Sequence, residues 1–99
     1  MSITRIGAGK RMSEAVIHGG KAYLAGFVAD KTVGKSVKEQ TADILAQIDA
    51  TLKQAGTDKT KILKANIWLT DIGKWAEMNE AWDAWVVAGQ TPARATVEA

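Results

Sequence analysis

The chain has no cysteine, a single proline and a single histidine. Without cysteine, disulfide bonds, thiolate metal sites and a cysteine nucleophile are excluded. One histidine provides too few ligands for an ordinary metal site, so we expect His18 to make a simple hydrogen bond at a strand end. The nucleophile elbow G-x-S-x-G is also absent. The sequence therefore gives little support to metal-dependent or covalent chemistry.

Long apolar runs and a strong charge imbalance are missing as well. No run of 18 apolar residues occurs, and Met1-Ser2-Ile3-Thr4-Arg5 lacks the apolar core of a secretory signal. The formal net charge of +2 is small for a nucleic-acid binder. Gly7-Ala8-Gly9-Lys10 lacks the glycine spacing of a phosphate loop. We expect no membrane or nucleic-acid partner, and a cytoplasmic location.

The composition that remains is typical of one globular domain. The chain has 99 residues, of which 46% are hydrophobic and 24% charged. No internal repeat, linker or low-complexity segment divides it. We therefore treat residues 1–99 as a single domain.

The first third of the chain predicts strands. Ile3–Ile6 fits a brief edge strand, and Ala15–His18 and Lys21–Ala29 fit a hairpin around Gly19-Gly20, because both turn residues of a type I′ turn need positive φ. Gly26 falls inside the second of these strands. It marks either the close approach of a ligand or another backbone, or a bulge, and the sequence leaves both open.

The middle of the chain predicts a helix. Ser36 and Glu39 match a capping box, an apolar stripe continues to about Ala55, and Gly56 follows as the stop. Asp43 and Gln47 lie off this stripe, and we expect them to face water.

A strand and a second helix follow. In the strand at 62–70, one face should lie under the helices and consists of Leu63, Ala65, Ile67 and Leu69. Trp68 points the other way. Asp71 can cap a second helix that runs from Ile72 or Lys74 to about Val87. Its inner side is expected to carry Trp75, Met78, Asn79, Trp82, Trp85 and Val86. The element order predicts two helices packed on one face of a mixed sheet, with the face around Trp68 covered by a symmetric partner.

The stretch 91–99 leaves the helix end at Gly89 and enters a strand. Pro92 makes the approach rigid, so that Arg94 is held at the strand start, and its planar fork of donors suits a small carboxylate. An ion pair with Glu98, on the same side of the strand, is an equal alternative. Asn79 either bonds to a nearby loop backbone or borders the cleft that Arg94 enters.

The run Pro92-Ala93-Arg94-Ala95-Thr96-Val97-Glu98 resembles the signature of the Rid family, the YjgF-like reactive-imine deaminases. Further landmarks agree in order and spacing over nearly the whole chain: Ala22-Tyr23-Leu24-Ala25-Gly26, Asn66-Ile67-Trp68-Leu69-Thr70-Asp71 and Met78-Asn79-Glu80-Ala81-Trp82. The resemblance implies a chorismate-mutase-like α+β fold and a homotrimer with clefts between subunits. It also implies hydrolysis of imines and enamines such as 2-aminoacrylate to 2-keto acids and ammonia, without a metal or cofactor.

The resemblance also implies roles for single residues. Arg94 matches the arginine that grips the substrate carboxylate, Gly26 matches a backbone contact beside the imine, and Asn79 and Thr96 match pocket positions. Met12 stands where many active members have a tyrosine that reaches the neighbouring site, and Ala25 stands where they have a hydroxyl residue.

The family's last strand, with a glutamate thought to position the attacking water, is expected to lie beyond Ala99. Two functions follow from this: an imine deaminase, or a non-catalytic trimeric module that binds small 2-keto or amino acids.

Overall fold

The computed structural model describes residues 2–99, so Met1 of the N-terminal segment considered above lies outside the described residues. Across residues 2–99, three strands come first, and a helix, a strand, a second helix and a last strand follow, with short 3₁₀ turns at Lys59–Lys61 and Ile72–Lys74. The strands and helices are β1 (Thr4–Ile6), β2 (Ala15–His18), β3 (Lys21–Leu24), α1 (Val37–Gln54), β4 (Lys64–Leu69), α2 (Trp75–Trp85) and β5 (Ala93–Glu98).

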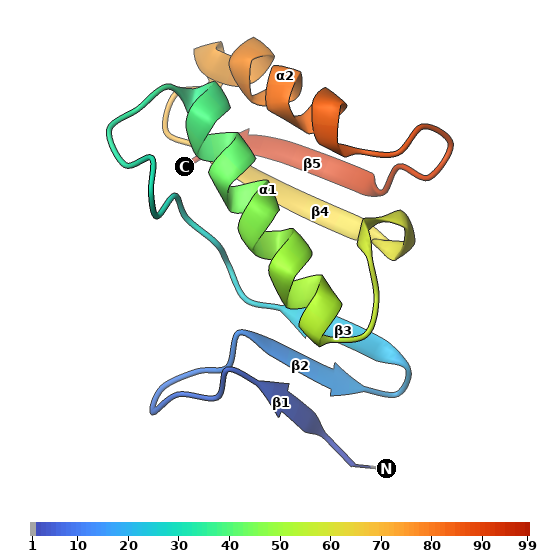
Figure 1. The fold of residues 1–99 in the computed structure, drawn as a ribbon. Coiled ribbons are helices and arrows are strands. Elements are labelled where there is room, and N and C mark those ends of the chain that lie inside the picture. The colour runs from blue at the N-terminus through green and yellow to red at the C-terminus, as the bar shows by residue number, and fades with distance from the viewer. Residues whose placement is uncertain (1) are drawn as a thin grey trace.

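Strand pairing is mixed, as the sequence predicts, but it divides into two hydrogen-bonded groups. β1, β2 and β3 form an antiparallel sheet, and β4 pairs with β5 in parallel. Figure 1 shows both helices on one side of these strands, with α1 crossing from β4 and β5 to β3. Helix α1 therefore joins the two groups of strands.

The turn and cap residues behave as their chemistry predicts. Gly19 and Gly20 have φ of 61° and 77°, which closes the tight turn between β2 and β3. The Ser36 hydroxyl accepts the Glu39 N–H at 3.1 Å at the start of α1. Gly56 follows the helix with φ of 80°, a conformation that favours glycine.

The main core lies between the two helices and β4. Leu45, Leu69, Met78 and Trp82 form its buried cluster, and Met78 has no exposed surface. Alternation along β4 directs Ala65, Ile67 and Leu69 toward this cluster. Because α1 and α2 both pack against β4 through this cluster, the cluster sets the position of one helix relative to the other.

The structure corrects several details of the prediction. β3 ends at Leu24, so Gly26 lies in an irregular segment after the strand and is not a bulge within it, whereas the close approach of a ligand or another backbone stays a prediction. Leu63, predicted to lie under the helices, precedes the first residue of β4 and is 74% exposed. Trp75 is 50% exposed, because it is the first residue of α2 and has few neighbours at the helix end.

The opposite face of β4 and β5 is open. Trp68 is 62% exposed and pairs across the strands with Val97, which is also exposed. On the antiparallel sheet, Tyr23 is exposed as well. No helix among the described residues is long and apolar enough to cross a membrane.

Two leucines test this account of the core. Leu45 is 4% exposed and Leu63 is 74% exposed. We expect Leu45→Ala to lower the free energy of unfolding by about 2–5 kcal/mol, because it removes buried methyl groups and leaves a cavity. The matched variant Leu63→Ala should change it by less than about 0.5 kcal/mol. Urea unfolding followed by circular dichroism measures both, and equal losses would contradict the assignment of the core.

Candidate functional site

Arg94 lies on β5 and faces the helices. Ala93 and Ala95 on either side of it are exposed, whereas Arg94 and Thr96 are half-buried, as alternation along a strand requires. The Arg94 Nη1 donates to Asn79 Oδ1 at 2.7 Å, and the same nitrogen lies 3.9 Å from Met78 Sδ. The Asn79 amide therefore binds Arg94, and its oxygen is not used for a loop backbone.

The guanidinium of Arg94 also lies over the indole ring of Trp82. The Arg94 Cζ lies 5.1 Å from the centroid of the Trp82 ring, and Trp82 itself is 7% exposed. A cation at this distance from an indole gains about 0.5–2 kcal/mol, more when it is shielded from water. We call Arg94, Asn79, Met78 and Trp82 the guanidinium cluster.

The alternative ion pair with Glu98 does not form. Glu98 Oε1 accepts the N–H of Ile72 at 3.1 Å, which ties the end of β5 to the start of the turn before α2. Within residues 2–99, Arg94 makes no salt bridge. Its positive charge is therefore held by an amide and an aromatic face, neither of which neutralises it.

Thr96 follows Arg94 on the same face of β5. Its Oγ1 is buried and has no hydrogen-bond partner among the described residues. A buried hydroxyl without a partner costs about 1–3 kcal/mol. An unpaired polar atom two residues from an unneutralised guanidinium is a feature that a polar ligand or a water would relieve.

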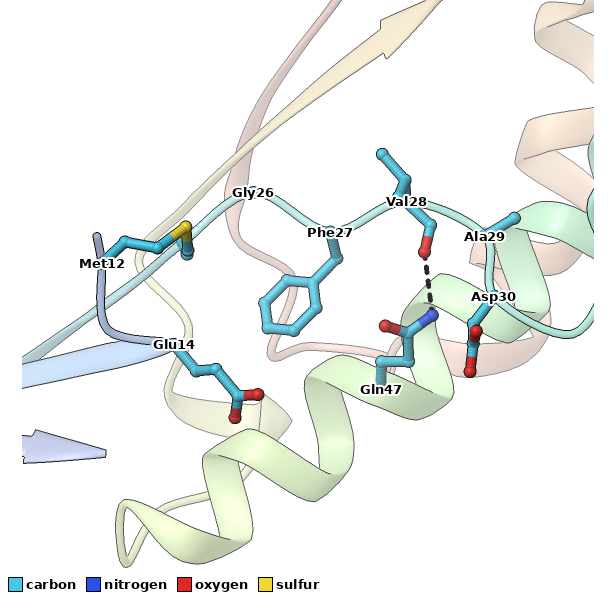
Figure 2. Close-up of a pocket in the computed structure, with 9 residues that line it drawn as sticks. Met12, Glu14, Gly26, Phe27, Val28, Ala29, Asp30 and Gln47 are labelled. Atoms are coloured by element: carbon cyan, nitrogen blue, oxygen red, sulfur yellow. Dashed lines mark hydrogen bonds between the residues drawn. The ribbon is translucent and has the colours of Figure 1, made fainter. Parts of the chain in front are cut away.

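Met12, Ala25 and Gly26 meet elsewhere. They line a pocket of about 330 Å³ together with Glu14, Phe27 and Gln47, and Figure 2 shows Phe27 between Gly26 and Gln47. We call this hollow the Gly26 pocket. No member of the guanidinium cluster lines it, and neither does Thr96. One copy of the chain therefore brings the predicted site residues together as two separate groups.

Neither the backbone conformation nor the packing within this chain requires a glycine at position 26. A Cβ added to Gly26 would meet nothing within 4 Å, and the φ of Gly26 is not positive. Any reason for the lack of a side chain must come from something outside this chain, such as a ligand or a second copy.

Helix α1 holds the segment that carries Gly26. The Asp43 Oδ2 accepts the N–H groups of Asp30 at 2.8 Å, Lys31 at 2.9 Å and Thr32 at 3.2 Å, and the Thr32 hydroxyl at 2.9 Å. Gln47 donates to the Val28 carbonyl at 2.9 Å, a bond drawn in Figure 2, and to Asp43 Oδ1 at 3.1 Å. The expectation that Asp43 and Gln47 face water is wrong.

These hydrogen bonds shift the acidity of Asp43. The N–H of Asp30 contributes most, and with Thr32, Gln47 and Lys31 it lowers the pKa of Asp43 from 3.8 to about 2, against a smaller opposing effect of desolvation. Sequence reasoning missed this contact because the partners of Asp43 lie 11 to 13 residues away and are backbone groups.

A second hollow, of about 650 Å³, lies between α1 and α2. Its polar groups are already paired. Lys38 bridges to Glu80 at 3.4 Å, the Trp85 indole donates to Asp49 at 2.9 Å, and Lys59 lies 5.2 Å from the Trp85 ring centroid. Within residues 2–99, no group of three His, Cys, Asp or Glu side chains could hold a metal ion. The guanidinium cluster and the Gly26 pocket remain the candidate site.

The Asp43 contacts predict an acid-sensitive loop. Because its pKa is lower in the folded chain, the stabilisation is complete above the ordinary value of 3.8 and is lost as the pH falls toward about 2. We expect Asp43→Asn to speed amide hydrogen exchange at Lys31 and Thr32 and to reduce the dependence of stability on pH over that range. Asp83→Asn, on the exposed side of α2, should do neither. Unchanged exchange in Asp43→Asn would contradict the holding role.

The chain is similar in sequence to a known protein family and to several of its members. The family model described as Endoribonuclease L-PSP matches residues 2–99. The RutC family protein YoaB of Escherichia coli K12 is 48% identical over the whole chain, which covers 85% of that protein. A RutC family protein of Haemophilus influenzae is 44% identical with the same coverage.

A crystal structure of NMB1025 from Neisseria meningitidis, described as a member of the YjgF protein family, superposes with a TM-score of 0.95. It is 52% identical, and the match covers all of this chain and 82% of the other. The model match over nearly the full length and these identities show that the chain belongs to the YjgF/RutC family.

Proposed function

We propose that the protein hydrolyses reactive 2-imino and enamine acids to 2-keto acids and ammonia, with Arg94 as the anchor of the substrate carboxylate. One observation carries the proposal: a half-buried guanidinium is held in place by Asn79 and Trp82 without an acidic partner in the described part of the chain. The side-chain hydrogen bonds of Arg94 to described residues all start at Nη1, which leaves the donors on Nε and the second terminal nitrogen for a ligand.

A small carboxylate suits those donors. An arginine fork can bind a carboxylate through two parallel hydrogen bonds, and each bond to a charged group contributes about 1.5–3 kcal/mol. Because Asn79 and Trp82 already fix the guanidinium, little further side-chain entropy is lost when the ligand binds. The unpaired Thr96 hydroxyl offers a further hydrogen bond nearby.

The reaction itself asks little of the protein. An imine reacts with water unaided, so orientation of the substrate and of one water is enough to accelerate the reaction usefully. This fits a site without a metal or a cofactor.

The separation of the two groups of site residues favours an assembly. If Gly26, Ala25 and Met12 serve the same substrate as Arg94, they must come from a second copy of the chain. The exposed Trp68 and Val97 on the open face of β4 and β5 form the apolar surface that such copies would cover. We propose a homotrimer with the site between neighbouring copies.

One observation favours a second function. The guanidinium cluster contains no acid or base that could activate a water. On its own it would serve a non-catalytic module that binds small 2-keto or amino acids. RNA cleavage, which the description of the family model names, has less support, because a net charge of +2 is small for an RNA ligand.

The role of Arg94 can be tested with a coupled assay. A serine dehydratase supplies 2-aminoacrylate, and the rate of pyruvate release is measured with and without this protein. We expect the wild-type protein to accelerate release and Arg94→Ala to abolish the acceleration, because the carboxylate loses its anchor. Arg94→Lys should retain only a small part, since a lysine lacks the planar fork.

Controls separate loss of the site from loss of the fold. Arg5→Ala, at an exposed position of β1, should behave like the wild type, and circular dichroism should show that all variants are folded. If the wild type gives no acceleration but binds pyruvate through Arg94, the binding module is supported and the deaminase is rejected. Unchanged activity in Arg94→Ala would overturn the anchor.

The assembly can be tested by mass in solution. Light scattering should give three times the chain mass of 10.6 kDa. Trp68→Glu should shift the mass toward that of one chain, because it places a charge in the covered apolar face. Lys53→Glu, on α1, should leave the mass unchanged. A wild-type protein of single-chain mass would contradict a site shared between copies.

A further inference from the structure

Asn79 binds one of the three nitrogens of the Arg94 guanidinium, and this restricts how a ligand can be bound by the other two. We propose that Asn79 is a positioning residue that acts through Arg94: it holds Nη1, so that the substrate carboxylate is bound side-on, by Nε and Nη2. The inference rests on the proposed role of Arg94 as carboxylate anchor and adds the residue that sets the geometry of binding.

Both hydrogens of Arg94 Nη1 have acceptors within the chain. Nη1 donates to Asn79 Oδ1 at 2.7 Å and to Met78 Sδ at 3.9 Å. A terminal guanidinium nitrogen carries two hydrogens, so these two contacts use all that Nη1 can donate. A thioether sulfur is only a weak acceptor. The amide oxygen of Asn79 is therefore the contact that holds Nη1 in place.

A planar guanidinium offers a carboxylate two edges for a pair of parallel hydrogen bonds. One edge consists of Nη1 and Nη2, and the other consists of Nε and Nη2. The first edge requires an Nη1 hydrogen that Asn79 or Met78 already accepts. The second edge donates to no residue in the described part of the chain. A carboxylate can therefore bind side-on without breaking an existing contact.

The Trp82 ring and Asn79 restrain Arg94 in different ways. Arg94 Cζ lies 5.1 Å from the centroid of the indole ring. The attraction of a cation to the face of a ring depends weakly on how the guanidinium is turned in its own plane. A hydrogen bond is directional, so the 2.7 Å bond from Nη1 to Asn79 opposes that turn. Trp82 therefore stabilises the cation, whereas Asn79 decides which edge is left for a ligand.

The chemistry of an amide suits this task. The guanidinium has no acceptor, so the oxygen of Asn79 and not its NH₂ group must face Arg94. The oxygen is neutral, and it leaves the charge of Arg94 available to an anion. Asn79 follows Met78 on α2, and the full burial of Met78 fixes the backbone at this point. Asn79 itself is half-buried and outside the core cluster, so it can be replaced without opening the core.

The test uses pyruvate, a stable product of the proposed reaction, as the carboxylate probe. In ¹⁵N-labelled protein, the Arg94 Nε–H signal is assigned by its loss in Arg94→Lys. We expect pyruvate to shift this signal downfield in the wild type, because a carboxylate oxygen accepts the Nε hydrogen. Asn79→Ala should raise the Kd for pyruvate about tenfold or more, the contribution of one hydrogen bond to a charged group. It should also reduce the shift at saturation, because the released Nη1 makes the other edge available.

Two further variants separate the acceptor from its lack of charge. Asn79→Asp keeps the size of the side chain and an oxygen for Nη1, but its negative charge competes with the ligand. We expect it to raise the Kd for pyruvate at least as much as Asn79→Ala does. Gln54→Ala, the matched control at an exposed amide of α1, should change the Kd by less than about twofold.

The outcomes distinguish this inference from the proposed function. If Arg94→Ala loses pyruvate binding but Asn79→Ala keeps the wild-type Kd and Nε–H shift, the inference fails and the anchor stands. Weaker binding with an unchanged shift at saturation also overturns it, since the edge that binds the carboxylate would then be the same. A wild type that binds no pyruvate rejects the inference, whereas the coupled assay still decides the anchor. If circular dichroism shows that Asn79→Ala is unfolded, a folded Asn79→Asp must lose pyruvate binding for the inference to stand.

Discussion

The half-buried charge of Arg94 is the constraint on which the candidate site depends. Removing a guanidinium from water is costly unless hydrogen bonds or other favourable contacts replace its hydration. Asn79 and Trp82 provide such contacts, through a 2.7 Å hydrogen bond and an aromatic face at 5.1 Å. Both are neutral, so the positive potential persists. An aspartate in place of Asn79 would hold the arginine equally well and would remove its attraction for a carboxylate.

Helix α1 positions both groups of site residues. Leu45 packs in the core with Met78 and Trp82, the two residues that contact the guanidinium. From the same stretch of helix, Asp43 and Gln47 hold the backbone that follows Gly26. One rigid helix therefore sets the position of Arg94 through α2 and the position of the Gly26 pocket through hydrogen bonds. The site that we propose between copies of the chain would need this precision, because each half would have to match a partner that it does not contact in its own chain.

Local signals in the sequence predicted most of the fold. The Ser36 capping box, the Gly19-Gly20 turn and Gly56 each have a chemistry that is decided by a few neighbouring residues, and all three are confirmed. The division of the strands into two groups could not be predicted in this way, since pairing depends on residues far apart in the chain.

In the candidate site too, residues marked by a local pattern could be predicted, and contacts between distant segments could not. Arg94 and Asn79 could be found from the pattern of the last strand and from a polar residue on an apolar helix face, although their direct contact is visible only in the structure. The role of Asp43 could not be found, because backbone groups from another segment define its surroundings. Gly26 was singled out for a strand interior that it does not occupy.

The stacking of Arg94 on Trp82 has a practical consequence. Indole emission responds to the electric field of nearby charges, and here a full positive charge lies over the ring of a tryptophan that is shielded from solvent. An anion that docks on the guanidinium must alter that field. The chain therefore carries an intrinsic optical reporter of occupancy at the very group proposed to receive the ligand.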